Sequence, residues 1–388
     1  MSDAADSSPA FVEAVDRRAL ASREAAWRDL AARAGERNVF AEPDFLAPAL
    51  NRLAGERIRV LLVWSDATRA ALIGLAAIAA PPLPWALASL WRSEQAALPA
   101  ILLDKEAAEA ALTAIVDALA AFRPRPVGLR LPYSLVDGPL AAAAATLAAR
   151  RSLTLLAAHR RRRAALIIVP KASFEARVDK RRRKEWARQR RRLEELGPVD
   201  SQVAADATAI EAFLAIENGG WKGARRSALA AQAERAAFAR ETLGRFAARG
   251  ALEVHLLSLK GEPIAAGALL RTGDRAFYWK TAYDERFAAF SPGVQATLDM
   301  SRRAERDPGL TVIDSCAVAD HPMIERAWRD RIELVDLAIS LRPGGGGAFA
   351  LAAAAAHGFE RLKRRARHFL RARGRPRPEA ERTDFTRV

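Results

Sequence analysis

The chain has 388 residues, which is long enough for two domains, because single hydrophobic cores usually stop growing well before this length. Its 51% hydrophobic and 28% charged residues are typical of a globular protein, and its single cysteine excludes an internal disulfide or a cysteine-based metal cage. The net charge of +16 favours a polyanionic partner, whether nucleic acid, acidic lipid or a phosphate-rich cofactor.

Two further classes of protein do not fit the sequence. The five histidines show no zinc-ligand spacing, so we expect no metal. No run approaches the roughly 20 uncharged apolar residues that a membrane span needs, and the acidic, polar N-terminus lacks the order of a signal peptide. We therefore expect a cytoplasmic protein, at most peripheral to the inner face of the membrane.

The first half alternates amphipathic helices with short apolar strands. Apolar residues at helical spacing predict helices over 17–35 and from Asn38 to Leu50. Two apolar runs, 57–64 and 71–80, then flank the turn at Ser65-Asp66-Ala67 and predict a β-hairpin. The remaining expected elements are strands at 85–91, 153–157 and 164–169 and helices at 105–122 and 139–150.

The second half repeats this order. A hairpin over 252–270 with a turn at Lys260-Gly261-Glu262-Pro263 precedes a third strand at 275–283, then a helix, a strand at 310–314, a helix and a strand at 332–339. Both halves thus read strand, turn, strand, strand, helix, strand, helix, strand, which indicates a weak internal duplication, with coincidence as the alternative. We expect an α/β (α+β) fold of tandem domains, each a mixed sheet flanked by helices, joined by a long basic helix.

The domain boundaries follow from composition. We expect an N-terminal domain over 1–170 and a second domain over 171–340, with a basic helical insertion at 172–196 that Ser173 caps and Gly197-Pro198 ends. Residues 341–388 read as a Gly-rich hinge, an Ala-rich helix from about 348 and a basic tail without apolar periodicity, disordered at its end. The basic segments 180–192 and 361–377 are candidates for contact with anionic membrane or nucleic acid.

The most informative stretch is Ser291-Pro292-Gly293, which opens a predicted helix. A helix that begins at Gly after Pro presents free backbone N–H groups and the positive end of its dipole, which suits a pyrophosphate. A helix cap without a ligand is the alternative at this point.

Five short stretches, taken in order and spacing, resemble the GNAT-fold acyltransferases of the CelD-like branch. That branch is linked with cellulose and exopolysaccharide biosynthesis, and its folds are similar to the Fem aminoacyl transferases. The resemblance covers about 170–340 and rests on Trp221-Lys222, Leu259 to Gly267, Tyr278 to Asp284, Ser291-Pro292-Gly293 and Ile313-Asp314.

The resemblance implies a place for acyl-CoA, expected as acetyl-CoA. Its pyrophosphate would lie just after the fourth strand of the fold, against Phe290, Ser291, Pro292, Gly293 and Val294. The common GNAT pattern, an Arg or Gln followed by x-x-Gly-x-Gly/Ala, is reduced here to Gly293. The matching stretch of the first half, 91–99, has no glycine and carries Glu94, so we expect no cofactor site in the first domain.

Acyl transfer needs a base for the acceptor and a polarised thioester carbonyl. Asp314, at the end of an apolar strand, is the first candidate base, with a helix cap as the alternative. Tyr283 and Asp284 flank the predicted cofactor loop and are further catalytic candidates. His321 is a base or, more simply, a capping residue. Cys316 is a small buried residue or, as a lesser alternative, a nucleophile paired with His321.

Three function classes remain open at this stage. The first is an acyltransferase (EC 2.3 class) that moves an acyl group from acyl-CoA to an amine or hydroxyl of a small-molecule or saccharide acceptor, with Trp221, Lys222 and Lys280 as candidate substrate contacts. The second is a Fem-like aminoacyl transferase that uses a tRNA-borne donor. The third is a non-enzymatic protein that binds polyanions or membrane surfaces.

Overall fold

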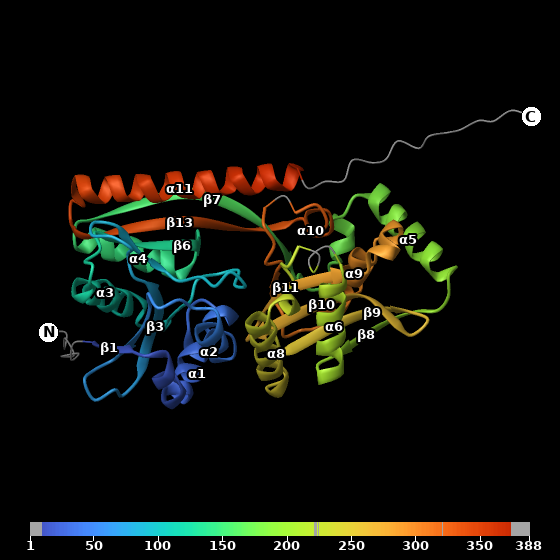
Figure 1. Cartoon of the computed structure of the whole chain (residues 1–388), viewed down its shortest axis with the longest axis horizontal. Helices are drawn as coiled ribbons and strands as arrows, with labels where there is room; N and C mark the ends of the chain where they lie inside the picture. Colours follow the sequence, from blue (N-terminus) through green and yellow to red (C-terminus); the bar gives the residue numbers. More distant parts are fainter. Residues whose placement is uncertain (1–9, 221–222, 224, 320, 374–388) are drawn as a thin grey trace, which may run out of the picture.

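The computed structural model describes residues 10–220, 223, 225–319 and 321–373. Its strands are β1 (Phe11–Val15), β2 (Ile58–Trp64), β3 (Leu72–Ala79), β4 (Leu87–Leu90), β5 (Ile101–Leu103), β6 (Gly128–Leu135), β7 (Leu153–Ile167), β8 (Val199–Ala204), β9 (Leu252–Leu259), β10 (Glu262–Thr272), β11 (Arg275–Tyr283), β12 (Val312–Asp314) and β13 (Asp330–Pro343). They form one thirteen-stranded mixed sheet in the order β1-β2-β3-β4-β6-β13-β7-β12-β11-β10-β9-β8, with β5 paired to β3 (Figure 1). The mixed α/β fold class is confirmed, and the two expected sheets are joined edge to edge.

Helices cover both faces of this sheet. They are α1 (Glu24–Arg33), α2 (Pro43–Arg52), α3 (Ala108–Ala118), α4 (Pro139–Arg150), α5 (Lys180–Glu194), α6 (Ala207–Gly219), α8 (Ala233–Ala248), α9 (Pro292–Ala304), α10 (Ile324–Ala327) and α11 (Gly346–Arg373). In the second half, α6 and α8 share a core with the β9–β11 hairpins, whereas α9 and α10 pack in a separate core. Within the described residues, no helix is long and apolar enough to cross a membrane.

Several local patterns fold as the sequence predicts. Strands β9 and β11 and helix α4 have the predicted bounds. Between β9 and β10, Lys260 and Gly261 both have positive φ angles, 53° and 83°, which a two-residue hairpin of this twist requires.

Two long strands correct the predicted domain plan. The segment predicted as two strands, 153–157 and 164–169, is the single fifteen-residue strand β7. Its partner β13, predicted to close the second half, lies instead between β6 and β7 of the first half. The boundary expected at 340 therefore falls inside a strand of the shared sheet (Figure 1).

The arginine run in the middle of β7 is strand and not loop, because a strand sends alternate side chains to opposite faces. Arg161 pairs with Asp336 at 2.8 Å, and Arg163 pairs with Asp314 at 3.0 Å. The intervening Arg160 and Arg162 are exposed near Glu333. The arginines on both faces of the strand therefore have acidic partners.

The basic helix begins later than predicted. The Asp179 carboxylate accepts the backbone N–H groups of Arg181 and Arg182, so α5 starts at Lys180. Ser173 caps only the short 3-10 turn Phe174–Arg177 that precedes it. An aspartate accepting two N–H groups is the stronger cap, which moves the start of the helix by two turns.

The two halves are packed together through one apolar core. It contains the T-shaped contacts of Phe45 with Phe40, Phe238 and Trp279, at 4.9 to 5.8 Å between ring centroids. Beside it, the buried Asp44 carboxylate pairs with arginines of both halves: Arg28, Arg245 and Arg249. Apolar packing and buried ion pairs together hold the second half against the first.

Candidate active site

Strands β11 and β12 separate at the centre of the second half. They pair in parallel only over Arg275↔Val312, Ala276↔Ile313 and Phe277↔Asp314. Strand β12 then ends, and the chain turns away at Cys316, which has a φ of 55°. The last six residues of β11, 278–283, continue without this neighbour. The separation leaves the backbone and side chains of that strand facing an opening in the sheet.

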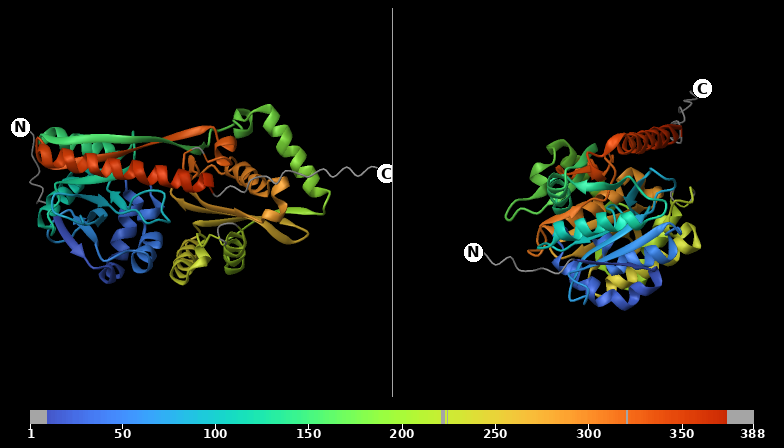
Figure 2. Two further views of the ribbon diagram at one scale, coloured as in Figure 1. Left: turned by 45° about the horizontal axis from the view of Figure 1, so that its top comes forward. Right: turned by 90° about the vertical axis from the view of Figure 1, so that its left-hand side faces the viewer.

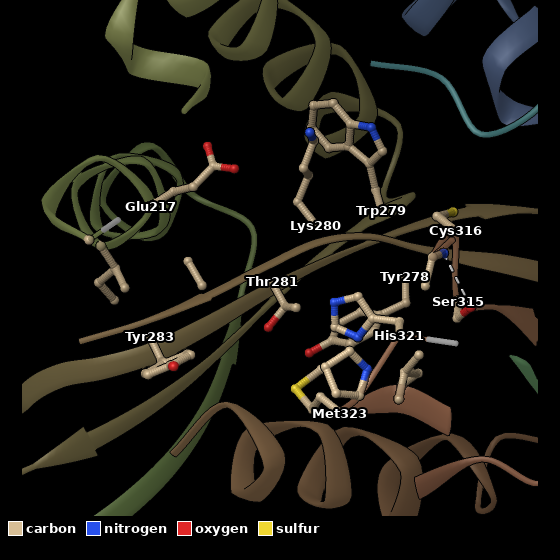
Figure 3. A pocket seen from close by; sticks show the side chains of 16 residues that line it. Glu217, Tyr278, Trp279, Lys280, Thr281, Tyr283, Ser315, Cys316, His321 and Met323 are labelled. Carbon is tan, nitrogen blue, oxygen red and sulfur yellow. Dashed lines mark hydrogen bonds between the residues drawn. The ribbon is translucent and has the colours of Figure 1, made fainter. Parts of the chain in front are cut away.

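A cavity of about 400 Å³ fills this opening (Figure 3). It is lined from three sides, by β11, by the segment after β12, and by α6. The lining residues are Tyr278 to Tyr283, Ser315 to Ala317, His321 to Ile324, Ile216, Glu217 and Gly220. Because α6 and α10 lie on different faces of the sheet, the cavity is bordered by elements of both faces.

A β-bulge lies in the wall of the cavity. Ala268 pairs with Lys280 and Leu269 pairs with Tyr278, so Trp279 is the extra residue of β11. Its indole N–H donates to the backbone carbonyl of Gln95 in the first half, at 2.7 Å. A bulge locally disrupts the ladder and re-aims its residues, which is common beside active sites.

The predicted cofactor loop adjoins the same cavity. Ser291 has left-handed dihedrals (φ 52°, ψ 52°), and α9 begins at Pro292. A Cβ placed on Gly293 would lie 3.2 Å from Tyr283 Cδ1 and 3.6 Å from Met323 Sδ, and both of these side chains line the cavity. Gly293 thus allows the positive end of α9 to approach the cavity closely.

The rest of this loop packs against the basic helix. Phe290 lies with Leu193 of α5 in one apolar cluster, and the Arg192 guanidinium lies 5.7 Å from the Phe290 ring centroid. The α9 side chain Gln295 donates to the Trp186 carbonyl of α5 at 3.0 Å, and Val294 is half-buried. Helix α5, which packs against this loop, carries seven exposed cations: Lys180, Arg181, Arg183, Lys184, Arg188, Arg191 and Arg192.

The predicted catalytic residues are not brought together. The buried Asp314 carboxylate accepts from Arg163 at 3.0 Å and from the Cys316 N–H at 2.7 Å, and it does not line the cavity. Asp284 also lies outside the lining; it caps a 3-10 turn, and a hydrogen bond from Arg286 lowers its pKa. Tyr283 does line the cavity.

The predicted substrate residues have different outcomes. Lys280 lines the cavity, with its Nζ 5.8 Å from the Trp279 ring centroid. Trp221 and Lys222 lie outside the described residues.

His321 lines the cavity and its carbonyl accepts the Glu325 N–H. Burial and the Asp314 charge raise the pKa of the Cys316 thiol, which disfavours a thiolate nucleophile.

Sequence reasoning missed Glu217. This α6 residue lines the cavity with only 1% of its surface exposed, and its Oε2 accepts the Leu229 N–H at 2.8 Å. Figure 3 shows its carboxylate on the side of the cavity opposite Met323. The sequence carries one signal that could have identified Glu217: it is an acidic residue on the apolar face of a helix, four residues after Phe213.

The stretch of the first half that matches the cofactor loop serves as an interface. Within 91–99, the Gln95 carbonyl accepts from Trp279, Glu94 pairs with Arg235 at 2.9 Å, and the Ala97 carbonyl accepts from Arg163. These contacts occupy the stretch, while the absence of a cofactor site in the first half stays a prediction.

Among the described residues, no group of three or more His, Cys, Asp or Glu side chains is placed to hold a metal ion.

Comparison with known proteins identifies the kind of domain that carries this site. Residues 180–325 match the family model of the acetyltransferase (GNAT) domain. A search among curated protein sequences gives no match. The chain therefore carries a GNAT-fold acetyltransferase domain and is an acyltransferase of EC class 2.3, as the sequence predicts.

Solved structures share the fold over nearly the whole chain. FemX is 12% identical, with a TM-score of 0.50, over 86% of this chain and 96% of its own. The C-terminal domain of an Agrobacterium fabrum protein designated a lysylphosphatidylglycerol synthetase is 12% identical, with a TM-score of 0.52, over 87% and 96%. A conserved Bacteroides thetaiotaomicron protein of unknown function is 10% identical, with a TM-score of 0.52, over 85% and 99%.

Proposed function

We propose that the chain transfers an acyl group from acyl-CoA, with acetyl-CoA as the first donor to test, to an amine or hydroxyl acceptor. The observation that supports the proposal is the close approach of the α9 N-terminus, at Gly293, to Tyr283 and Met323, two side chains that line the cavity. An anion-binding helix terminus beside an opening in the sheet suits a donor that joins a diphosphate to a long flexible arm.

The donor diphosphate would lie against Ser291 and Gly293, with Phe290, Pro292 and Val294 shaping the loop and the α5 cations attracting its charge. From Tyr283 back to Trp279 the strand covers about 13 Å at roughly 3.3 Å per residue. This stretch of β11 lacks a neighbour on the β12 side, so it offers backbone groups along which the arm can extend. We therefore assign Tyr283 to donor binding, and the reacting thioester to the vicinity of the bulge.

The chemistry at the bulge would be carried by three groups. Backbone N–H groups around Trp279 would polarise the thioester carbonyl. Glu217 would take the proton of the attacking amine or hydroxyl from the α6 side. As the bond from the acceptor nitrogen or oxygen to the acyl carbon forms, the carbon–sulfur bond breaks, and the leaving thiolate takes up the proton held by Glu217, directly or through water. Lys280 lies in the same wall of the cavity. Its ammonium group would bind a carboxyl or phosphate group, either of the acceptor or of the donor.

The other candidate bases receive different roles in this proposal. Asp314 would position Arg163 and the turn at Cys316, because its hydrogen bonds to both hold it away from the cavity. Asp284 would fix the start of the 3-10 turn that leads to Ser291. Trp221 and Lys222 stay proposed substrate contacts on the strength of the resemblance.

The acceptor class is proposed from resemblance. Likeness to the CelD-like branch favours a sugar or exopolysaccharide precursor that carries an amine or hydroxyl. The buried carboxylate of Glu217 favours an amine among these, because a carboxylate attracts an ammonium group before it takes the proton.

A Fem-like aminoacyl transferase is the second candidate. The exposed cations of α5 beside the donor loop favour it, because an RNA-borne donor brings many phosphates to that surface. The two candidates share the cavity and the bulge and differ in the donor.

Thermal unfolding with and without acetyl-CoA and CoA, at low and high salt, tests the donor. A site filled at about 100 times its dissociation constant adds roughly 2.7 kcal/mol of stability. We expect a shift that persists at high salt and disappears in Gly293→Glu. Gly55→Glu is the matched control, because Gly55 is exposed and a Cβ added to it would have no atom within 4 Å. No shift, together with transfer from charged tRNA, would replace the first candidate with the second.

A further inference from the structure

Among the residues whose side chains the structure describes, helix α11 contacts the sheet from Phe349 to His357, whose ring lies 5.2 Å from the ring of His159 on β7. Phe349 and Ala353 are buried against the sheet, and Phe349 packs so closely on Gly128 that a Cβ there would lie 2.6 Å from the ring. The main contacts of α11 are with β4, β7 and β13. Figure 2 shows the helix along the outside of the molecule, beside β7 and β13.

The opposite side of α11 presents large apolar side chains to solvent. Leu351, Phe359 and Leu362 are 74%, 58% and 65% exposed. At about 100° per residue these three positions fall within about 80° of one another, on the side away from Phe349. In the sequence, Ala366, Phe369 and Leu370 continue the same spacing. The helix expected from about 348 begins at Gly346 and continues to Arg373, so it includes part of the segment expected as tail.

The same helix is strongly basic. Its last thirteen residues, 361–373, include seven Lys or Arg and no Asp or Glu. The seven are Arg361, Lys363, Arg364, Arg365, Arg367, Arg371 and Arg373. A helix with a Leu/Phe stripe and Lys/Arg at its other positions is suited to lie in the plane of a bilayer interface, with its apolar side among the acyl chains.

We propose that α11 docks this protein on an anionic lipid bilayer, with Leu351, Phe359 and Leu362 entering the boundary between headgroups and acyl chains. Anionic headgroups would bind the Lys and Arg residues of 361–373. A nucleic acid would use the cations and leave the three apolar side chains in water. A second copy of the chain would bring two such basic helices together, which their charge opposes. The proposal is independent of the acyl donor and of the residues of the cavity.

Flotation of the full chain with vesicles of phosphatidylcholine alone or with phosphatidylglycerol, at low and high salt, tests this. We expect binding to the anionic vesicles that high salt weakens and does not abolish, since the apolar stripe contributes a salt-independent part. The triple variant Leu351→Ser/Phe359→Ser/Leu362→Ser should bind at least tenfold more weakly, with an unchanged Tm because the three side chains are exposed.

Two controls separate the stripe from general charge. Ala350→Ser/Ala354→Ser places serines at exposed positions of the same helix outside the stripe and should leave vesicle binding unchanged. Arg181→Gln/Arg183→Gln/Arg188→Gln removes exposed cations of α5 and should lower binding less than the stripe variant does. A dye at Leu362→Cys, in a Cys316→Ser background, should shift its emission to the blue on binding.

Other outcomes would overturn the proposal. Equal binding by the wild type and the stripe variant, or binding that high salt removes completely, would show that charge alone acts. A stripe variant that loses affinity for a single-stranded oligonucleotide and keeps its affinity for vesicles would assign the surface to nucleic acid. If the stripe variant is a monomer where the wild type is a dimer, and both bind vesicles equally, the apolar stripe would be an interface with a second copy of the chain.

Discussion

Trp279 on β11 donates its indole N–H to the carbonyl of Gln95, at 2.7 Å, across the junction between the two halves. Trp279 is the bulged residue in the wall of the cavity, and Gln95 belongs to the stretch of the first half that matches the cofactor loop of the second. The first half thus contributes to the candidate active site by fixing the bulge.

Trp279→Phe should therefore affect stability and catalysis together. The change leaves the buried Gln95 carbonyl without its hydrogen-bond donor, which should lower the free energy of unfolding by about 1–3 kcal/mol. It also removes the contact that fixes the bulge, so kcat/KM should fall. Urea unfolding and steady-state kinetics measure the two effects. Trp27→Phe is the control, because it removes a buried indole hydrogen bond of 2.8 Å to the Ala41 carbonyl, and neither residue lines the cavity. It should cost stability with little effect on kcat/KM; unchanged stability in Trp279→Phe would disprove the coupling.

Glu217→Gln tests the proposed base. The amide oxygen can still accept the Leu229 N–H, so the fold should persist, while kcat should fall by about 10²-fold or more because the proton acceptor is lost. The KM for the acyl donor should stay near the wild-type value. Glu211→Gln, an exposed change on the same helix, should leave kcat unchanged. Retention of wild-type turnover by Glu217→Gln would exclude Glu217 as the base.

Asp314→Asn separates a positioning role from a catalytic one. Removal of the carboxylate charge leaves the buried Arg163 without an anionic partner, and breaking such a pair costs about 3–5 kcal/mol. We expect a large loss of stability in urea unfolding, with reduced activity as a consequence. A variant that unfolds like the wild type and has lost all turnover would instead support Asp314 as the base.

The stability of the protein should depend on Glu36. Burial raises the pKa of this carboxyl to about 7, against the attraction of Arg275. The folded state then holds a proton that the unfolded state releases from pH 4.5 upward, so stability is lost as the pH rises from about 4.5 to 7. Glu36→Gln should be more stable than the wild type at pH 8, by about 1–3 kcal/mol, and nearly equal at about pH 4.5. Urea unfolding at both pH values checks this, with the exposed Glu56→Gln as the control; a pH-independent difference would contradict the assignment.

The local elements could be predicted from the sequence, because their signals lie in neighbouring residues. Alternation identified β9 and β11 to the residue, and the Ser-Pro-Gly sequence placed the start of α9 beside Tyr283. Glu217 gave no such signal, since an acidic residue in a helix is ordinarily solvent-exposed. Asp314 looked catalytic because its partner Arg163 lies 151 residues earlier in the chain, and sequence spacing does not report that pair.

The place of β13 also determines when the first half can complete its sheet during synthesis. Strands β6 and β7 do not pair with each other; each pairs with β13, whose residues follow β7 by more than 160 positions. Closing so long a loop is entropically slow, and the ribosome delivers β13 near the end of translation. Until then β6 and β7 expose unpaired backbone edges, which are templates for misassociation. The nascent first half should therefore depend on chaperone protection until β13 is released, and a chain that stops before Asp330 should aggregate instead of forming an autonomous domain.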